Sequence, residues 1–473
     1  MLADKIKELP PTPDILALRE RIDLILAEYE SFEYDFGLKI TSLEHPQTFY
    51  EYQIDKPFIP ASNLKIITTG AAFSILGSDF RWTTDFYIND FGNLYIRASG
   101  DPTWNNSFKK NMINSVTKSI SDSLKFYGFH RINNIAVDPG TFHNSQIGLG
   151  WKDENRLFTY SAKPSVIAFN DNAVQIMINP ASVGMPARIS LYPVNSGFKI
   201  VNHVTTVSNR NRQGFDFATD HDNNTLTIRG NIWVNSRTQY RSIAIPRPEL
   251  YALNVLKTKL IEYGIRIDGD VYFDSISGRD IILNFYKNYF SIYSPPLYEI
   301  ANEINKRSNN FMANQLFLTI GDENGHTLGA ERIINQWLAS HKIATDSLSM
   351  YDGSGLSIYN QCTVDVFTDV LKTMAKSQWS NEFKNSLAIS GVDGTLKNTF
   401  RDPLLHNKVY AKTGFIQGAR GLSGYIKTND DEELAFSFMI NKRDSRINNF
   451  NRIAERILIE LVSFCRDQNY APL

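Results

Sequence analysis

The chain has 473 residues, and its 42% of hydrophobic side chains, with 12% aromatic, is enough to build a large core. Its 49 basic and 50 acidic side chains give a net charge of -1, which provides no electrostatic reason to expect nucleic acid or an anionic membrane as a partner. No apolar stretch approaches the roughly 18 residues of a membrane span, and no apolar signal segment begins the sequence. We therefore expect either a cytoplasmic protein or an exported one whose signal is not included.

The first third of the chain is predicted to combine helices with a pair of strands. Residues 12–14 supply a helix-capping threonine, a proline and an acid, and apolar residues then recur at helical spacing. Residues 37–43 and 48–52 alternate like two strands joined by a turn. Residues 62–76 predict a second helix that ends at Gly77.

The middle of the chain, about residues 83–290, has a different texture. Short β-like runs alternate with Asn, Asp, Gly and Pro, and two helical stretches interrupt them at 106–127 and 249–263. We predict an inserted region of two smaller, mostly β domains, with about 83–155 nested within the rest.

The last third returns to the texture of the first third. It has helical patterns at 296–320 and 328–340, strands at 411–426 and 433–440, and a final helix at 449–466. Because the cost of closing a loop grows slowly with its length, residues 1–82 and 291–473 can form one domain around the insertion.

Cys362 and Cys465 are the only cysteines. They have no C-x-x-C spacing and few nearby histidines, so we expect neither a zinc site nor any other metal. We expect both thiols to be buried as small hydrophobic groups, with a single disulfide between them as the alternative.

Ser62 and Lys65 stand three residues apart in Pro60-Ala61-Ser62-Asn63-Leu64-Lys65. On a helix this spacing puts both side chains on one face. A serine hydroxyl is a poor nucleophile until a neighbour takes its proton, and a lysine can do so when burial or other cations destabilise its ammonium form. A lone S-x-x-K instead favours a helix cap beside a solvated lysine.

Ser308-Asn309-Asn310 is predicted at a helix end or in a loop between helices. The Ser308 hydroxyl there is able to relay a proton to a leaving amine. The Asn310 amide both accepts and donates hydrogen bonds, as holding a peptide backbone requires. Taken alone, the same residues describe a polar turn.

Lys412-Thr413-Gly414 lies on a predicted strand that a turn joins to a second strand. Alternation places Lys412 and Gly414 on one side and Thr413 on the other. Gly414 leaves room for a substrate strand to pair at the edge, while Lys412 and Thr413 supply a cation and a hydroxyl for an anionic end group. The alternative is an exposed edge-strand lysine.

Ser-x-x-Lys, Ser-x-Asn and Lys-Thr-Gly, in this order, resemble the signature of penicillin-recognising serine enzymes. Four segments narrow the resemblance: 60–65, Gly100-Asp101-Pro102-Thr103, Asp352-Gly353-Ser354-Gly355-Leu356-Ser357 and Gly391-Val392-Asp393-Gly394-Thr395-Leu396. With the long insertion, they are similar to the class C low-molecular-mass penicillin-binding proteins, the D-alanyl-D-alanine carboxypeptidase/endopeptidase family of the penicillin-binding protein 4 type. The resemblance runs from about Gly37 to the final helix.

The resemblance implies an α+β catalytic domain, an antiparallel sheet flanked by helices, formed by 1–82 and 291–473. It implies that Ser62 is the acylated nucleophile and Lys65 its general base. Ser308 assists proton transfer, and Asn310 contacts the substrate amide.

The same resemblance implies that Lys412, Thr413 and Gly414 line the place of the substrate's terminal carboxylate. The oxyanion hole is then formed by the backbone N–H groups of Ser62 and Phe415. The implied partners are peptidoglycan stem peptides, with β-lactams as inhibitors, no cofactor, and a periplasmic or otherwise extracytoplasmic location.

The chain departs from the family pattern at two positions. Phe415 stands where a threonine is usual, so one hydroxyl for the carboxylate is lost, and Gln417 or Arg420 is a candidate replacement. Ile358 stands where an arginine often contacts the substrate's side-chain end, and Asp153 lies where the family often has an acid near that end.

Two other functions fit the same residues. One is a β-lactamase or D-amino-acid esterase on the same scaffold, and the other is a non-catalytic peptidoglycan-binding homologue. The sequence favours neither carboxypeptidase nor endopeptidase activity over the other, and it leaves the preferred stem peptide and the oligomeric state open.

Overall fold

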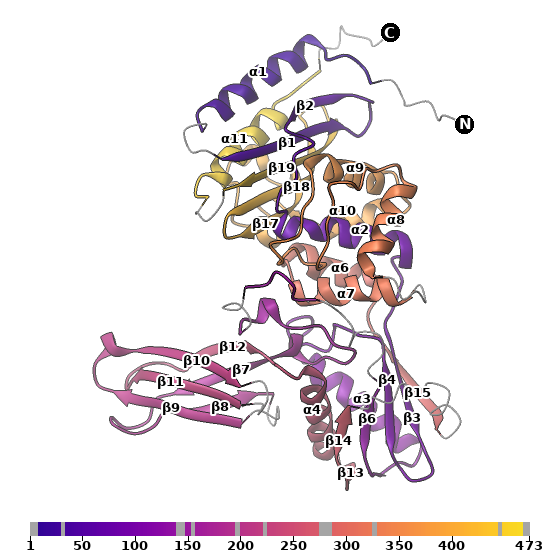
Figure 1. Ribbon diagram of the computed structural model, residues 1–473, viewed down its shortest axis with the longest axis vertical. Helices are drawn as coiled ribbons and strands as arrows, with labels where there is room; N and C mark the ends of the chain where they lie inside the picture. Colours follow the sequence, from indigo (N-terminus) through magenta and orange to yellow (C-terminus); the bar gives the residue numbers. More distant parts are fainter. Residues whose placement is uncertain are drawn as a thin grey trace. The chain divides into compact units, whose positions relative to one another are not determined.

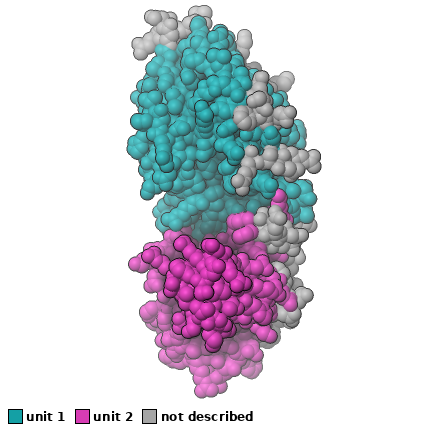
Figure 2. Space-filling view, turned by 90° about the vertical axis from the view of Figure 1, so that its left-hand side faces the viewer, with its two compact units in different colours: residues 1–80, 148–150, 296–473 teal, residues 81–147, 151–295 magenta. Residues whose placement is uncertain are grey.

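The computed structural model describes residues 8–29, 34–138, 147–152, 157–193, 199–220, 225–273, 286–323, 329–442 and 447–466. The chain divides into two compact units (Figure 2). The first consists of Met1–Phe80, Gly148–Gly150 and Pro296–Leu473, and the second of Arg81–Ile147 and Trp151–Pro295. No helix in the described parts of the chain combines the length and the apolar character that crossing a bilayer requires.

A six-stranded antiparallel sheet organises the first unit, in the order β16-β17-β18-β19-β1-β2 (Figure 1). Its strands are β16 (Ala388–Ile389), β17 (Val409–Ile416), β18 (Ala419–Lys427), β19 (Glu433–Asn441), β1 (Asp35–Ser42) and β2 (Thr48–Tyr52). β1 pairs with β19 on one side and with β2 on the other. The sheet therefore unites strands from the beginning and the end of the sequence.

Helices cover both faces of this sheet. On one face, α1 (Pro13–Ala27) contacts α11 (Phe450–Val462). On the other face, α9 (Val364–Ala375) contacts β1, β18 and β19. Alternation along β1 explains the division, because Leu38 faces the core beneath α1 and α11 whereas Gly37 faces Val364 of α9.

Further helices of this unit pack around α2 (Lys65–Leu76). They are α6 (Leu297–Lys306), α7 (Asn310–Glu323), α8 (Ala330–Ser340) and α10 (Ser380–Ser386). α2 contacts α6, α7, α8, α9 and α10, so the segment that follows Ser62 is central to the helical layer. Gly77 ends α2 with a φ of 86°, which a residue without Cβ adopts easily.

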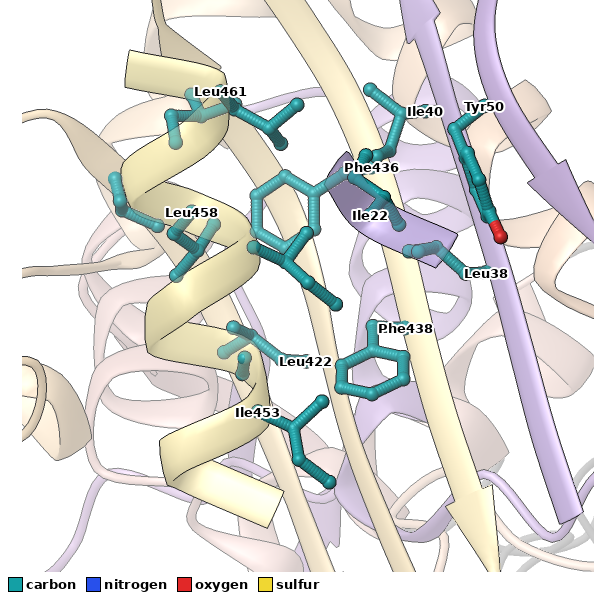
Figure 3. Packing of buried hydrophobic residues seen from close by; sticks show 14 of the residues in the cluster. Ile22, Leu38, Ile40, Tyr50, Leu422, Phe436, Phe438, Ile453, Leu458 and Leu461 are labelled. Carbon is teal, nitrogen blue, oxygen red and sulfur yellow. The ribbon is translucent and has the colours of Figure 1, made fainter. Parts of the chain in front are cut away.

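The apolar core under α11 fixes the sheet against its helices. Figure 3 shows side chains of β18 and β19 beside those of α11: Leu422, Phe436, Phe438, Ile453, Leu458 and Leu461. Phe438 stacks on Phe450, with the ring centroids 5.1 Å apart. Full burial of a side chain of this size contributes about 1.5–3 kcal/mol. The prediction of an α+β fold, with an antiparallel sheet flanked by helices, is confirmed.

The described residues of the second unit form four sheets and two longer helices. The sheets are β14-β6-β4-β3-β15, β10-β11-β9, β12-β7-β8 and β13-β5. Their strands are β3 (Thr83–Ile88), β4 (Leu94–Ala98), β5 (Arg131–Ile132), β6 (Ile135–Val137), β7 (Ala173–Asn179), β8 (Arg188–Tyr192), β9 (Lys199–Val207), β10 (Gly214–Asp220), β11 (Thr225–Trp233), β12 (Gln239–Ala244), β13 (Arg266–Ile267), β14 (Val271–Phe273) and β15 (Lys287–Tyr293). The helices are α3 (Met112–Phe126) and α4 (Pro248–Glu262). That 83–290 forms two domains inserted into a catalytic domain of 1–82 and 291–473 stays a proposal.

The prediction that Thr12 is the N-cap residue of the first helix is confirmed, although its side chain makes no capping hydrogen bond. Two other local predictions are wrong. The helix expected from residue 106 begins only at Met112, because Asn106 Oδ1 accepts from the backbone N–H of Ile113 and holds the preceding residues in a turn. Cys362 is buried, but Cys465 is exposed beyond the end of α11, and both thiols are free.

Candidate active site

Ser62 lies in a short 3-10 helix, η2 (Ala61–Leu64), that leads directly into α2. η2 contacts β17 and β18. Two glycines permit this approach, because a Cβ on Gly414 would lie 2.8 Å from the Pro60 carbonyl oxygen and one on Gly421 would lie 2.5 Å from Asn63 Nδ2. Asn63 Nδ2 also donates to Ser423 Oγ at 2.9 Å, which ties the Ser62 turn to β18.

Lys65 is fully buried, and its Nζ lies 2.9 Å from Ser62 Oγ. It also lies 2.7 Å from Asn310 Oδ1 and 2.7 Å from the Ser354 carbonyl oxygen. Burial, assisted by the nearby charge of Lys412, lowers the pKa of Lys65 well below its usual value. A neutral amine has two N–H groups and one lone pair. In its neutral form, an amine that donates its two N–H groups to these two carbonyl oxygens would direct its lone pair toward Ser62 Oγ.

Lys412 is fully buried on β17 and donates from Nζ to Ser308 Oγ at 2.9 Å. It donates also to the Thr413 carbonyl oxygen at 2.7 Å. Burial lowers the pKa of Lys412 to about 7. Ser308 has a φ of +58° between α6 and α7, a left-handed conformation that is rare outside glycine.

The three sequence motifs meet through the segment 308–310. Ser308 at its first position contacts Lys412, and Asn310 at its third position contacts Lys65. Thr413 Oγ1 donates to Thr395 Oγ1 at 2.9 Å, so the segment 391–396 also reaches this site. The structure thus brings a hydroxyl, its neighbouring amine, a second hydroxyl and a second lysine into one cluster.

Phe415 and Arg420 lie opposite each other on β17 and β18. The Phe415 ring is 62% exposed, and Arg420 Cζ lies 3.7 Å from its centroid. Burial lowers the pKa of Arg420. Its Nε is buried and has no hydrogen-bond partner among the residues that the structure describes.

The remaining sequence candidates are less informative. Asp153 lies outside the described residues. Ile358 is part of the loop after Asp352, and its backbone N–H donates to the Gly150 carbonyl oxygen at 3.3 Å. Sequence reasoning assigned no partner to Asn63, to Thr395 or to the Ser354 carbonyl, although Thr395 and Ser354 both stand in segments that carried the family resemblance.

The fold and the clustered motifs define a penicillin-recognising serine peptidase, which is a hydrolase. Comparison with protein families agrees. The model described as the D-Ala-D-Ala carboxypeptidase 3 (S13) family matches residues 18–458. The chain belongs to this family.

Curated relatives and solved structures extend the similarity over most of the chain. A D-alanyl-D-alanine carboxypeptidase of Actinomadura sp. (strain R39) is 25% identical over 90% of this chain and 81% of that protein. A penicillin-sensitive carboxypeptidase A of Dictyostelium discoideum is 27% identical over 86% of this chain and 82% of that protein. The crystal structure of penicillin binding protein 4 from Haemophilus influenzae has a TM-score of 0.78 and 21% identity, covering 92% of this chain and 98% of that one.

Proposed function

We propose that this chain hydrolyses D-Ala-D-Ala ends, or D-Ala-linked cross-bridges, of peptidoglycan stem peptides through an acyl-enzyme at Ser62. The observation that supports the proposal most directly is the 2.9 Å separation of Ser62 Oγ from the Nζ of a buried lysine whose pKa is lowered. A lowered pKa favours the neutral form of the amine, which is the form able to accept a proton. The names of the curated relatives support the substrate class.

In the proposed acylation, Lys65 takes the Ser62 proton as Oγ attacks the carbonyl carbon of the penultimate D-Ala. The carbonyl oxygen becomes an oxyanion, which the backbone N–H groups of Ser62 and Phe415 stabilise. The C–N bond then breaks, and the proton that Lys65 accepted passes through the Ser308 hydroxyl to the leaving amine, which returns Lys65 to its neutral form. The product of this step is an ester between Ser62 and the shortened peptide.

Deacylation repeats the chemistry with water. Lys65 takes a proton from the water while the water oxygen attacks the ester carbonyl carbon. The C–O bond to Ser62 breaks, and Ser62 Oγ recovers a proton from Lys65. A β-lactam enters the same first step and forms an ester at Ser62, and it inhibits because this ester is proposed to be hydrolysed more slowly than the peptide ester.

The proposed substrate contacts follow the motifs. Lys412 and Thr413 bind the terminal carboxylate, and the half-buried guanidinium group of Arg420 adds a second cation beside them. The Asn310 amide contacts the substrate's peptide group. The expectation that Gly414 leaves room for the substrate is wrong, because its Cβ position faces the Pro60 carbonyl oxygen of the Ser62 turn. Asp153 is proposed, from the sequence alone, to lie near the side-chain end of the stem peptide.

Peptidoglycan lies outside the cytoplasmic membrane, so we propose that the chain works there. Stem peptides are its proposed partners, with no nucleic acid and no cofactor required for the steps above.

The test is intact-mass analysis after incubation with benzylpenicillin, together with D-Ala release from a peptide that ends in D-Ala-D-Ala. The wild-type chain is expected to gain one penicillin adduct and to release D-Ala, whereas Ser62→Ala does neither. Ser74→Ala, an exposed serine on α2, is the matched control and keeps both activities. An adduct that persists in Ser62→Ala, or a wild-type chain that is never acylated, contradicts the proposal. A cross-linked dimeric stem peptide, assayed in parallel, separates endopeptidase from carboxypeptidase activity.

A further inference from the structure

Asp352 is fully buried at the start of the loop that reaches the active site. Its Oδ1 accepts from the backbone N–H groups of Gly355 at 2.6 Å and Ser354 at 3.1 Å, and its Oδ2 accepts from that of Ser357 at 2.7 Å. Asn360 Nδ2 adds a bond to Oδ1 at 3.2 Å. The Asp352 carboxylate therefore fixes the backbone conformation of this loop by accepting several of its N–H groups.

The loop is also hydrogen-bonded to α2, which carries Lys65, and to α7, which carries Asn310. Thr68 Oγ1 on α2 donates to the Gly353 carbonyl oxygen at 2.9 Å, and the Gly353 N–H donates to Asn314 Oδ1 on α7 at 3.1 Å. At Gly355 the φ is +81°, and a Cβ there would lie 1.7 Å from the Ala61 carbonyl oxygen. The loop conformation that Asp352 holds is thus pressed against the turn that carries the nucleophile.

One consequence of this arrangement is chemical. The Ser354 carbonyl oxygen is one of the two acceptors that bind Lys65 Nζ, and Ser354 also donates its N–H to Asp352. We propose that Asp352 is a positioning residue for the reaction: it holds the Ser354 carbonyl against Lys65, so that the lone pair of the amine faces Ser62 Oγ. This inference rests on the proposed function, because it concerns the base of that mechanism.

The charge of Asp352 also acts on Lys65. Two charged groups influence the base, Lys412 on β17, which lowers the pKa of Lys65, and Asp352 in the loop, which raises it. Burial alone lowers the pKa of Lys412. Removing the negative charge of Asp352 is therefore expected to change the titration of Lys65 and to leave that of Lys412 in place.

The alternative is that Asp352 only stabilises its loop. A purely structural carboxylate would lower the unfolding temperature and the fraction of active protein when replaced, but it would not move the pH dependence of the remaining activity. The pH dependence of acylation therefore separates the two roles.

The experiment measures the second-order rate constant for acylation by benzylpenicillin from pH 4 to pH 9, for wild type, Asp352→Asn, Thr68→Val and Asp365→Asn. In Asp352→Asn the plateau rate is expected to fall roughly 10- to 100-fold, because the base is misplaced. Its acid limb is expected to move to lower pH by roughly 0.5–1 unit, because the ammonium form of Lys65 has lost a favourable charge. Thr68→Val removes one attachment of the loop without changing charge, so its rate falls and its acid limb stays.

Asp365→Asn is the matched control, since it removes a carboxylate of the same unit that pairs with Lys39 on β1; its profile should follow that of wild type. An acid limb in Asp352→Asn that coincides with the wild-type limb overturns the inference, as does an unchanged plateau rate. If Asp352→Asn does not fold, Thr68→Val decides, and an unaltered acylation rate in that variant overturns the positioning role. A wild-type chain that is not acylated at all instead contradicts the proposed function.

Discussion

The guanidinium group of Arg420 stacks on the Phe415 ring, with Cζ 3.7 Å from the ring centroid. The two residues pair directly across β17 and β18, one position beyond the pair formed by Gly414 and Gly421. An aromatic face attracts a cation, so Phe415 holds this arginine at the end of the strand that bears Lys412. Phe415, which stands in place of the usual threonine and its hydroxyl, therefore also positions the guanidinium cation of Arg420.

Replacing Arg420 by alanine should weaken substrate binding more than chemistry. Arg420→Ala is expected to raise KM roughly tenfold for a peptide ending in D-Ala-D-Ala, because a hydrogen bond to a charged group contributes about 1.5–3 kcal/mol. It should leave KM almost unchanged for the same peptide with a C-terminal amide. Steady-state kinetics on both peptides check this, with the exposed Arg401→Ala as control. Equal losses on the two peptides would show that Arg420 does not bind the carboxylate.

Phe415→Thr tests the departure from the family pattern. The backbone N–H that is proposed for the oxyanion hole remains, and a hydroxyl becomes available beside Thr413. We expect acylation by benzylpenicillin to persist and kcat/KM for the carboxylate peptide to rise by roughly a fewfold, limited by the lost support for Arg420. The double variant Phe415→Thr, Arg420→Ala separates the two effects. If kcat/KM falls in the single variant, the ring itself contributes to substrate binding.

Gly355→Ala should disable the site. Its φ of +81° disfavours any residue with a Cβ, and that Cβ would lie 1.7 Å from the Ala61 carbonyl oxygen, which is backbone and has no rotamer to change. The expected result is a loss of penicillin acylation of at least about tenfold together with a lower unfolding temperature. Gly329→Ala is the control, because no described atom outside Gly329 and its chain neighbours lies within 4 Å of the Cβ position there. Normal acylation in Gly355→Ala would show that the loop does not constrain the Ser62 turn.

Lys412→Met should lower the rate of acylation and raise the stability of the folded chain. The folded-state pKa of Lys412, about 7, lies below the ordinary lysine value of 10.5. The unfolded chain therefore binds more protons between these values, and wild-type stability rises with pH across this window. Below pH 7 the full cost of the buried charge is present. The unfolding temperature of Lys412→Met, relative to wild type, is thus expected to be highest at pH 6 and to decline towards pH 10, while acylation falls.

The pH dependence of the difference is the decisive measurement for Lys412, because a methionine also leaves Ser308 Oγ and the Thr413 carbonyl without this donor. Lys427→Met, at an exposed lysine, should show no comparable difference between pH 6 and pH 10. A difference for Lys412→Met that is constant over this range would show that Lys412 does not titrate near 7.

Local patterns in the sequence predicted much of the first unit. The contact between Ser62 and Lys65 follows from helical spacing alone. The strand that carries Lys412 and the strand that follows it were predicted from alternation and a turn. The order of the three motifs then predicted that distant segments meet, although no periodicity links Ser308 with Lys412. Their hydrogen bond depends on how α6, α7 and β17 pack, which a pattern in one segment does not encode.

Sequence patterns could not predict contacts made by backbone groups. The Ser354 carbonyl binds Lys65 through a group that every residue possesses, so no residue type marks it. The stacking of Arg420 on Phe415 depends on the register of β17 against β18, and a shift of one residue would separate them. The start of α3 was missed for a related reason, since the Asn106 side chain replaces helical hydrogen bonds by local ones.

Strand β1 lies between β2 and β19, so residues 35–42 have no neighbour on one side until residues 433–441 are in place. A chain emerging from the ribosome carries Ser62 and Lys65 long before it carries the strand with Lys412. Pairings this distant in sequence form late and slowly. A partly made molecule therefore holds Ser62 and Lys65 without β17, and the six-stranded sheet is completed only after residues 433–441 have been made.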